Sequence, residues 1–244
     1  MTEADNRDLV ATRLVLHRVA THVLGRRRHA VTGRFGLRAT PDGFGTPAYG
    51  DPTEVLRVAG THLVREVGSN ASVLALGGAS LGEVAAFAGA DLTTPFSAGD
   101  DTTPLGDIAA PLDVDPDVAT ALAEWFDLGW RSIDTTVAEA GAAGRATVLQ
   151  LWPEHFDAGC SVAVGPGDGD RCNIGASPGD GFADDPYLYV GPWGTERPGD
   201  PAYWNAPFGA VLMRATVLAA ADPVAEAVEF FRRGLSQSVD GVGG

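Results

Sequence analysis

Residues 157–177 read DAGCSVAVGPGDGDRCNIGAS, and this stretch decides the fold class. Two short runs alternate apolar with polar or small residues, which is typical of β-strands, and Gly165-Pro166-Gly167 between them is typical of a turn. The stretch therefore predicts an antiparallel hairpin with Cys160 opposite Cys172 on its apolar face. Two cysteines are too few for a disulfide scaffold, so we expect both to be free thiols.

The other face of this hairpin is polar or small. The same register sets Asp157 opposite Gly175 and His155 opposite Ser177. Glycine at 159 and 175 would let a ligand approach the backbone closely. This polar face predicts a small-molecule site in which His155 acts as an acid–base catalyst or a ligand and Asp157 orients it.

Two other roles remain open for the pair of His155 and Asp157. They could be two ligands of a metal ion, although no third ligand follows at a diagnostic spacing. They could also form a pair that only fixes a loop. A triad along the strand is excluded, because residues i and i+2 lie about 6.6 Å apart and a triad needs contacts of about 3 Å. A contact across the strands between His155 and Ser177 is still allowed.

Aromatic residues beside glycine and proline are concentrated in the second half of the chain. They predict the wall of a small-molecule pocket over the second-half sheet, although such residues also fill the core of a glycine-rich protein. We expect His155 and Asp157 to share one concavity whose wall includes at least two of Trp152, Tyr187, Trp193 and Trp204. The residues expected to bind the ligand are Trp152, Ser177, Tyr187, Trp193, Trp204 and Asn205.

Helical patterns flank the strand-like segments. The expected helices cover residues 6–28, follow Ser80, run from Asp115-Pro116 to Gly141 and Gly144, and begin at Asp222-Pro223. The strand-like segments between them are joined mostly by short antiparallel connections. The fold class predicted is α+β, with mostly antiparallel sheets packed against about four helices.

The segment 91–115 is rich in proline and aspartate and poor in apolar residues. It predicts an acidic connection that buries little surface. We expect a single domain over residues 1–244. The alternative is a division into two helix-plus-sheet halves, at about 6–90 and 115–235, joined by this connection.

The sequence Gly78-Ala79-Ser80-Leu81-Gly82 matches the G-x-S-x-G pattern of a nucleophile elbow. A serine acyl-transfer enzyme that uses Ser80 is therefore an alternative function. Strands and helices do not alternate through the chain as that fold requires, and Ser80 with Glu83 also forms a capping-box pattern. We favour the helix cap. A second alternative is a non-catalytic structural or interaction protein whose aromatic motifs only pack.

The charge balance excludes several functions. The 244 residues include 32 acidic and 17 basic side chains, all of them arginine, for a net charge of −15. A surface of this charge repels phosphate, so we expect no nucleic-acid partner, and the absence of lysine excludes Schiff-base chemistry. The arginines from Arg26 to Arg38 are interpreted as a helix C-terminus paired with acidic residues, rather than as an anion site.

The first residues lack the pattern of a signal peptide, and no apolar run is long enough to cross a membrane. We therefore expect a cytoplasmic protein without a membrane partner. A small molecule is the expected partner. The sequence assigns no cofactor, metal or oligomeric state.

Several longer motifs occur together in this chain: L-W-P-E-H-F-D at 151–157, N-x-G-x-S-P-G-D at 173–180, D-P-Y-L-Y-V-G-P-W at 185–193, W-N-A-P-F-G-A at 204–210 and R-x-G-L-R-A-T-P-D-G-F-G-T-P at 34–47. Across roughly residues 12–235 the chain resembles an uncharacterised protein family of high-GC bacteria and, more distantly, a broader bacterial domain of unknown function. The resemblance implies no established activity, cofactor or catalytic residue. The chain departs from the family where Ala183-Asp184-Asp185-Pro186 replaces an acidic or His residue followed by Pro-Glu-Pro.

Overall fold

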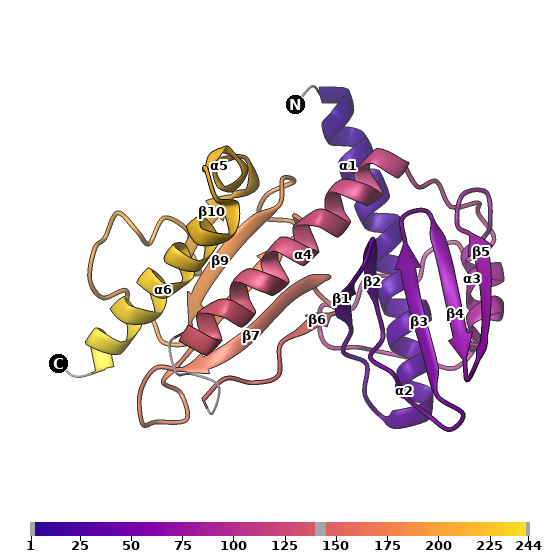
Figure 1. Cartoon of the computed structure of the whole chain (residues 1–244), viewed down its shortest axis with the longest axis horizontal. Helices are drawn as coiled ribbons and strands as arrows, with labels where there is room; N and C mark the ends of the chain where they lie inside the picture. The colour runs from indigo at the N-terminus through magenta and orange to yellow at the C-terminus, as the bar shows by residue number, and fades with distance from the viewer. Residues whose placement is uncertain (1–2, 140–144, 243–244) are drawn as a thin grey trace. The chain divides into compact units, whose positions relative to one another are not determined.

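Figure 1 shows the computed structural model of the chain, which describes residues 3–139 and 145–242. Two five-stranded antiparallel sheets and several helices confirm the predicted α+β class. The chain divides into two compact units, Met1–Asp127 with Gln150–Asp157, and Leu128–Leu149 with Ala158–Gly244. The acidic segment 91–115 lies entirely within the first unit.

The first sheet has the order β1-β2-β3-β4-β5, and the second has the order β10-β9-β8-β7-β6. The strands are β1 (Arg38–Thr40), β2 (Gly43–Gly45), β3 (Glu54–Ala59), β4 (His62–Val67), β5 (Asn70–Ala75), β6 (Gln150–Trp152), β7 (Asp157–Ala163), β8 (Arg171–Ser177), β9 (Tyr187–Pro192) and β10 (Ala210–Met213). The helices are α1 (Glu3–Val19), the π-helix η1 (Ala20–Gly25), α2 (Arg26–Thr32), α3 (Leu81–Ala88), α4 (Pro116–Glu139), α5 (Arg214–Ala219) and α6 (Pro223–Val242).

The first helix continues past its predicted end. The predicted end is residue 28, but Gly25 and Arg26 both have right-handed helical angles, and the helix ends only at Gly33, where φ is 70°. Gly25 serves close packing, since a Cβ atom there would lie 3.2 Å from the Pro153 ring. Helical conformation therefore runs from α1 through η1 into α2.

Aspartate side chains begin two of the predicted helices. The Asp115 carboxylate accepts the N–H groups of Asp117 and Val118 at 2.9 and 3.0 Å, one residue before α4. Asp222 accepts the N–H groups of Val224 and Ala225 in the same way at the start of α6. Both expected starts are confirmed, because an N-cap depends only on local sequence.

The predicted end of α4 at Gly141 and Gly144 lies outside the described residues. The strand β10 ends at Met213, and α5 follows at once. Within the part of the chain that the structure describes, no helix combines the length and apolar character needed to cross a membrane.

The central hairpin of the second unit forms with a register different from the predicted one. Cys160 pairs with Ile174, and Cys172 pairs with Val162, so the two cysteines are diagonal rather than opposite. Both are nevertheless buried on one face as free thiols, as expected. Burial raises the pKa of each thiol to about 12, so neither is a reactive nucleophile at neutral pH.

The register differs because of a side chain in the hairpin loop. The Asp170 carboxylate accepts the N–H of Gly167 at 2.7 Å, and the Asp170 carbonyl accepts the N–H of Val164 at 2.8 Å. These bonds place the turn one residue later than Gly165-Pro166-Gly167 predicts. A shift of the turn by one residue moves every cross-strand pair by two, which keeps the same faces buried.

The glycines on the other face of the hairpin do not leave room for a ligand. Gly159 and Gly175 face each other, as the structure of β7 and β8 requires. Tyr189 of β9 pairs with Gly175, and a Cβ atom there would overlap the Tyr189 ring, while a Cβ at Gly159 would lie 3.0 Å from its hydroxyl. The space predicted for a ligand is therefore filled by a side chain of the same sheet.

Gly129 marks a close approach of α4 to β8 in the second unit. A Cβ atom at Gly129 would overlap the Cβ of Ala176, which is fixed to the backbone of a buried strand. The helix can lie this close to the strand only because Gly129 has no side chain.

We predict that Gly129→Ala lowers the free energy of unfolding by about 1–3 kcal/mol through overpacking. The sign is informative, because the same change inside an unconstrained helix stabilises a protein by about 1 kcal/mol. Urea denaturation measures the effect. Gly181→Ala is the control, since nothing lies within 4 Å of a Cβ at that position. A gain in stability for Gly129→Ala would contradict the close packing.

Candidate functional site

The motif Leu151–Asp157 forms a tight turn between β6 and β7. The N–H of Phe156 donates to the carbonyl of Trp152 at 2.7 Å, and Phe156 has a left-handed φ of 59°. His155 lies within this turn, and β7 begins only at the buried Asp157. The strand predicted to start at His155 is therefore wrong, and strand alternation does not place His155 and Asp157 on one face.

Phe156 anchors the turn in the core of the first unit. Its side chain is 1% exposed and packs edge-on against Phe44 and Phe126, with ring centroids 5.1 and 5.2 Å apart. It also stacks on the imidazole of His17 at 5.3 Å, with the two planes 7° from parallel. A left-handed backbone conformation is unfavourable for phenylalanine, and this packing of the side chain holds Phe156 in it.

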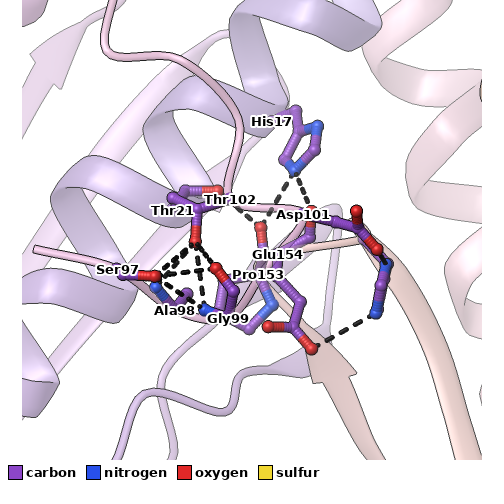
Figure 2. A network of polar contacts seen from close by, with 10 residues as sticks. His17, Thr21, Ser97, Ala98, Gly99, Asp101, Thr102, Pro153 and Glu154 are labelled. Carbon is purple, nitrogen blue, oxygen red and sulfur yellow. Dashed lines mark hydrogen bonds and ion pairs between the residues drawn. The ribbon is translucent and has the colours of Figure 1, made fainter.

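The helix α1–η1 supplies the hydrogen bonds that hold the turn, as Figure 2 shows. His17 Nε2 lies 2.9 Å from the carbonyl of Pro153 and 3.1 Å from that of Glu154, and the Thr21 hydroxyl donates to Pro153 at 2.5 Å. Carbonyls only accept, so the proton on His17 is on Nε2. Burial lowers the pKa of His17 to about 4, which keeps the imidazole neutral.

Glu154 and His155 leave the turn as a paired carboxylate and imidazole. His155 Nε2 lies 3.2 Å from Oε1 of Glu154, and Nδ1 lies 3.8 Å from Oδ2 of Asp101. The imidazole is 48% exposed, whereas the side chain of Glu154 is only 17% exposed. Burial raises the pKa of the Glu154 carboxyl, and the nearby His155 opposes that shift.

The segment 97–102 forms the other side of this site. The Thr102 hydroxyl accepts the N–H groups of Ala98 and Gly99 at 2.8 and 3.0 Å, and Ser97 donates to the Gly99 carbonyl at 2.7 Å. A Cβ atom at Gly99 would overlap the Glu154 carboxylate, so the carboxylate packs directly on this glycine. Figure 2 shows these loop residues beside Glu154.

The sequence pattern predicted His155 as a site residue but not the side chains and backbone groups that surround it. Glu154 is the neighbour of His155 in the motif, and its adjacency was a usable signal. His17 and Thr21 are spaced by four residues on the predicted first helix, which places them on one face. Asp101 and Gly99 lie in a segment that carries no local pattern, so only the folded chain brings them to the site.

Two predicted ligand-binding residues meet in the second unit. The hydroxyls of Ser177 and Tyr187 lie 3.4 and 2.6 Å from Oδ2 of Asp180. The rings of Phe182 and Phe208, both partly exposed, lie 5.1 Å apart, and Phe182 packs against Tyr187 at 5.6 Å. A carboxylate and an aromatic cluster therefore lie together in this unit.

The other predicted ligand-binding residues have separate surroundings. The Trp193 indole donates to Asn173 at 2.8 Å, and the Trp204 indole donates to the carbonyl of Pro198 at 2.7 Å. The Asn205 side chain makes two hydrogen bonds with the backbone of Val211. Trp152, at the end of β6, belongs to the first unit with His155 and Asp157.

Ser80 forms the predicted helix cap of α3. Its hydroxyl oxygen accepts the N–H of Glu83 at 3.2 Å, and the Glu83 carboxylate accepts the Ser80 N–H at 2.8 Å. The hydroxyl also lies 2.8 Å from the same carboxylate and donates to it. These hydrogen bonds lower the pKa of Glu83. The capping interpretation is confirmed, and the structure gives Ser80 a carboxylate partner.

The arginine cluster is engaged within the fold. Arg27 pairs with the buried Glu54 at 2.8 Å, and Arg65 pairs with the same carboxylate at 3.0 Å. Arg26 and Arg28 donate to the backbone carbonyls of Thr94 and Gly36. The expected pairing with acidic residues is confirmed for Arg27.

Within residues 3–139 and 145–242, no group of three or more His, Cys, Asp and Glu side chains is arranged to hold a metal ion. No protein-family model, no curated protein and no solved structure matches this chain. The chemistry available to it is therefore inferred from the side chains of the site.

We predict that His17 makes the first unit sensitive to acid. A folded pKa of about 4 lies below the usual 6.5, so the stabilising neutral form is complete above about pH 6.5 and is lost as the pH falls toward 4. The loss amounts to about 3 kcal/mol. Urea denaturation at pH 7 and pH 4 should show a smaller fall for His17→Gln than for the wild type. His62→Gln, at an exposed position of β4, is the control. Equal falls in wild type and His17→Gln would contradict the assignment.

We predict that Ser80→Ala lowers the free energy of unfolding by about 1 kcal/mol through loss of the cap. Ser236→Ala, at an exposed position on α6, should change it by less than about 0.5 kcal/mol. A fluorophosphonate probe tests the alternative role of Ser80, because a capping serine stays unlabelled. Labelling that disappears in Ser80→Ala would support acyl-transfer chemistry instead.

Proposed function

We propose that this chain binds a small molecule beside the turn 153–156 and transfers a proton to or from it with His155. One observation supports this proposal above the others. The imidazole of His155 is half exposed, and its Nε2 lies 3.2 Å from a carboxylate that is itself largely buried. An accessible imidazole held by a fixed carboxylate is the usual arrangement of a general acid–base group.

The surrounding residues define the role of each ring nitrogen. If Nε2–H donates to Glu154, the Nδ1 lone pair is left to accept a proton from the bound molecule. Glu154 is a positioning residue, because it acts through His155. Its backbone is held by His17, and its carboxylate packs on Gly99, so the orientation is fixed before a ligand binds.

The charges around His155 favour one class of substrate. Oδ2 of Asp101 lies 3.8 Å from Nδ1 of the imidazole. The charges of Asp100 and Asp101 also raise the pKa of the Glu154 carboxyl. The whole chain carries a net charge of −15. An anionic molecule would be repelled, so the proposed substrate is a neutral or cationic small molecule.

A second binding site is proposed in the second unit. Phe182 and Phe208 present partly exposed rings next to Asp180, which the hydroxyls of Ser177 and Tyr187 approach. Aromatic faces beside a carboxylate suit a cationic or aromatic ligand. This proposal retains the aromatic-walled site expected from the sequence, at the residues that the fold brings together.

The proposed setting is the cytoplasm, without nucleic acid as a partner. Two buried cysteines that remain free thiols are compatible with a reducing compartment. The net negative charge disfavours binding to a phosphate backbone.

We predict that His155→Ala abolishes the function while leaving the fold intact. Thermal-shift screening of neutral and cationic metabolites against the wild type identifies compounds that raise its Tm. Those compounds should not stabilise His155→Ala, and turnover of any that react should fall about 10²–10⁴-fold. The free energy of unfolding should change by less than about 0.5 kcal/mol, because the side chain is exposed.

His62→Ala is the matched control, since it removes another exposed imidazole of the first unit. It should keep the full response to each compound. Glu154→Gln should reduce turnover while keeping binding, as expected for a positioning residue. Unchanged stabilisation and turnover in His155→Ala would contradict the proposed site.

A further inference from the structure

The two edges of the first sheet differ. At one edge, Leu37, the residue before β1, exchanges hydrogen bonds of 2.8 and 2.9 Å with Leu151 of β6. At the other edge, β4 is the one strand among the described residues that pairs with β5, and Figure 1 shows β5 as the last strand of this sheet. Five of its six residues are exposed, and the strand NASVLA contains neither a charge nor a proline. Charge and proline are the usual means by which an edge strand avoids pairing.

The outward backbone groups of β5 can be assigned from the ladder. The N–H of Leu76 donates to the carbonyl of Thr61 at 2.9 Å, so every second residue before it also bonds to β4. The intervening residues Ala71, Val73 and Ala75 direct their N–H and carbonyl groups away from β4. Each supplies one donor and one acceptor to the open edge.

We propose that β5 pairs with the β5 strand of a second copy of this chain, antiparallel, with the two-fold axis at Val73. In this register Val73 lies opposite Val73 of the second copy, and Ala71 lies opposite its Ala75. All three outward residues of each strand are then hydrogen-bonded. If one strand slides along the other by one hydrogen-bonded pair, an outward-facing residue on each strand loses its partner. The register centred on Val73 is therefore favoured.

The side chains on the outer face match this two-fold arrangement. Val73 is 61% exposed, and its partner on β4 is Val64. Pairing about Val73 creates a continuous row of four valines across the two copies, which covers the exposed side chain. Cross-strand pairs of β-branched residues stabilise a sheet.

The charged side chains near this edge do not oppose a second copy, despite the acidity of the chain. In the row of side chains next to the valines, Glu66 and Ala71 of one copy are followed by Ala75 and then His62 of the second copy. Like charges therefore do not meet across the axis. Six residues per strand form a small interface, below the size typical of stable complexes. The expected dimer is weak and dissociates on dilution.

Val73→Pro tests the proposal selectively. The N–H of Val73 points away from β4, so proline removes the central bonds between copies and spares the ladder within the sheet. Val73→Lys is a second test, because it retains the backbone and places two cations opposite each other at the axis. Val73→Thr is the control, since it keeps a β-branched side chain and the N–H.

Sedimentation equilibrium should give a wild-type mass that rises with concentration from 25.2 kDa toward twice that value. Val73→Thr should follow the wild type, whereas Val73→Pro and Val73→Lys should stay monomeric. Hydrogen exchange at positions 71, 73 and 75 should slow with concentration in the wild type and in Val73→Thr, but not in Val73→Lys. If Val73→Pro does not fold, Val73→Lys decides the result. A wild type that stays monomeric up to about 1 mM, or a Val73→Lys variant that dimerises normally, would overturn the proposal.

Discussion

One helix supplies the hydrogen-bond donors on which two loops of the first unit depend. His17 and Thr21, one turn apart, satisfy carbonyls of the site turn. A second stripe at four-residue spacing, Arg18, His22 and Arg26, donates to carbonyls of the acidic segment at Leu105, Thr103 and Thr94. These carbonyls lie outside the strand ladders, so the helix side chains supply their hydrogen-bond donors. The acidic segment is therefore folded against the helix, and the site turn and the loop beside Glu154 share one support.

Local signals in the sequence predicted the helix starts and the presence of the hairpin, but not its register, and distant contacts determine the site. Ser80, Asp115 and Asp222 cap helices through bonds that span only three residues, so their pattern is sufficient. His155 was misplaced because the turn depends on Phe156 packing among residues far away in the chain. Likewise, whether glycines leave a ligand space or admit Tyr189 depends on a third strand.

The same residue type has opposite roles on the two sides of the site turn. His17 is neutral because burial lowers its pKa, and it acts as a fixed donor to the backbone. His155 extends into solvent with a carboxylate on each side. Environment rather than sequence makes one histidine structural and leaves the other available for chemistry. Glu154 joins them, since its carbonyl contacts the first and its carboxylate contacts the second.

The division of the chain makes the core of the first unit depend on residues that are synthesised late. The first unit comprises Met1–Asp127 and Gln150–Asp157, so Phe156 and the site turn are made after a stretch that belongs to the second unit. While the ribosome is still adding residues 128–149, Phe44 and Phe126 lack the ring that later packs between them. The core of the first unit therefore cannot be completed until residues 150–157 have been synthesised. A gene cut at residue 127 would encode neither a complete core nor His155.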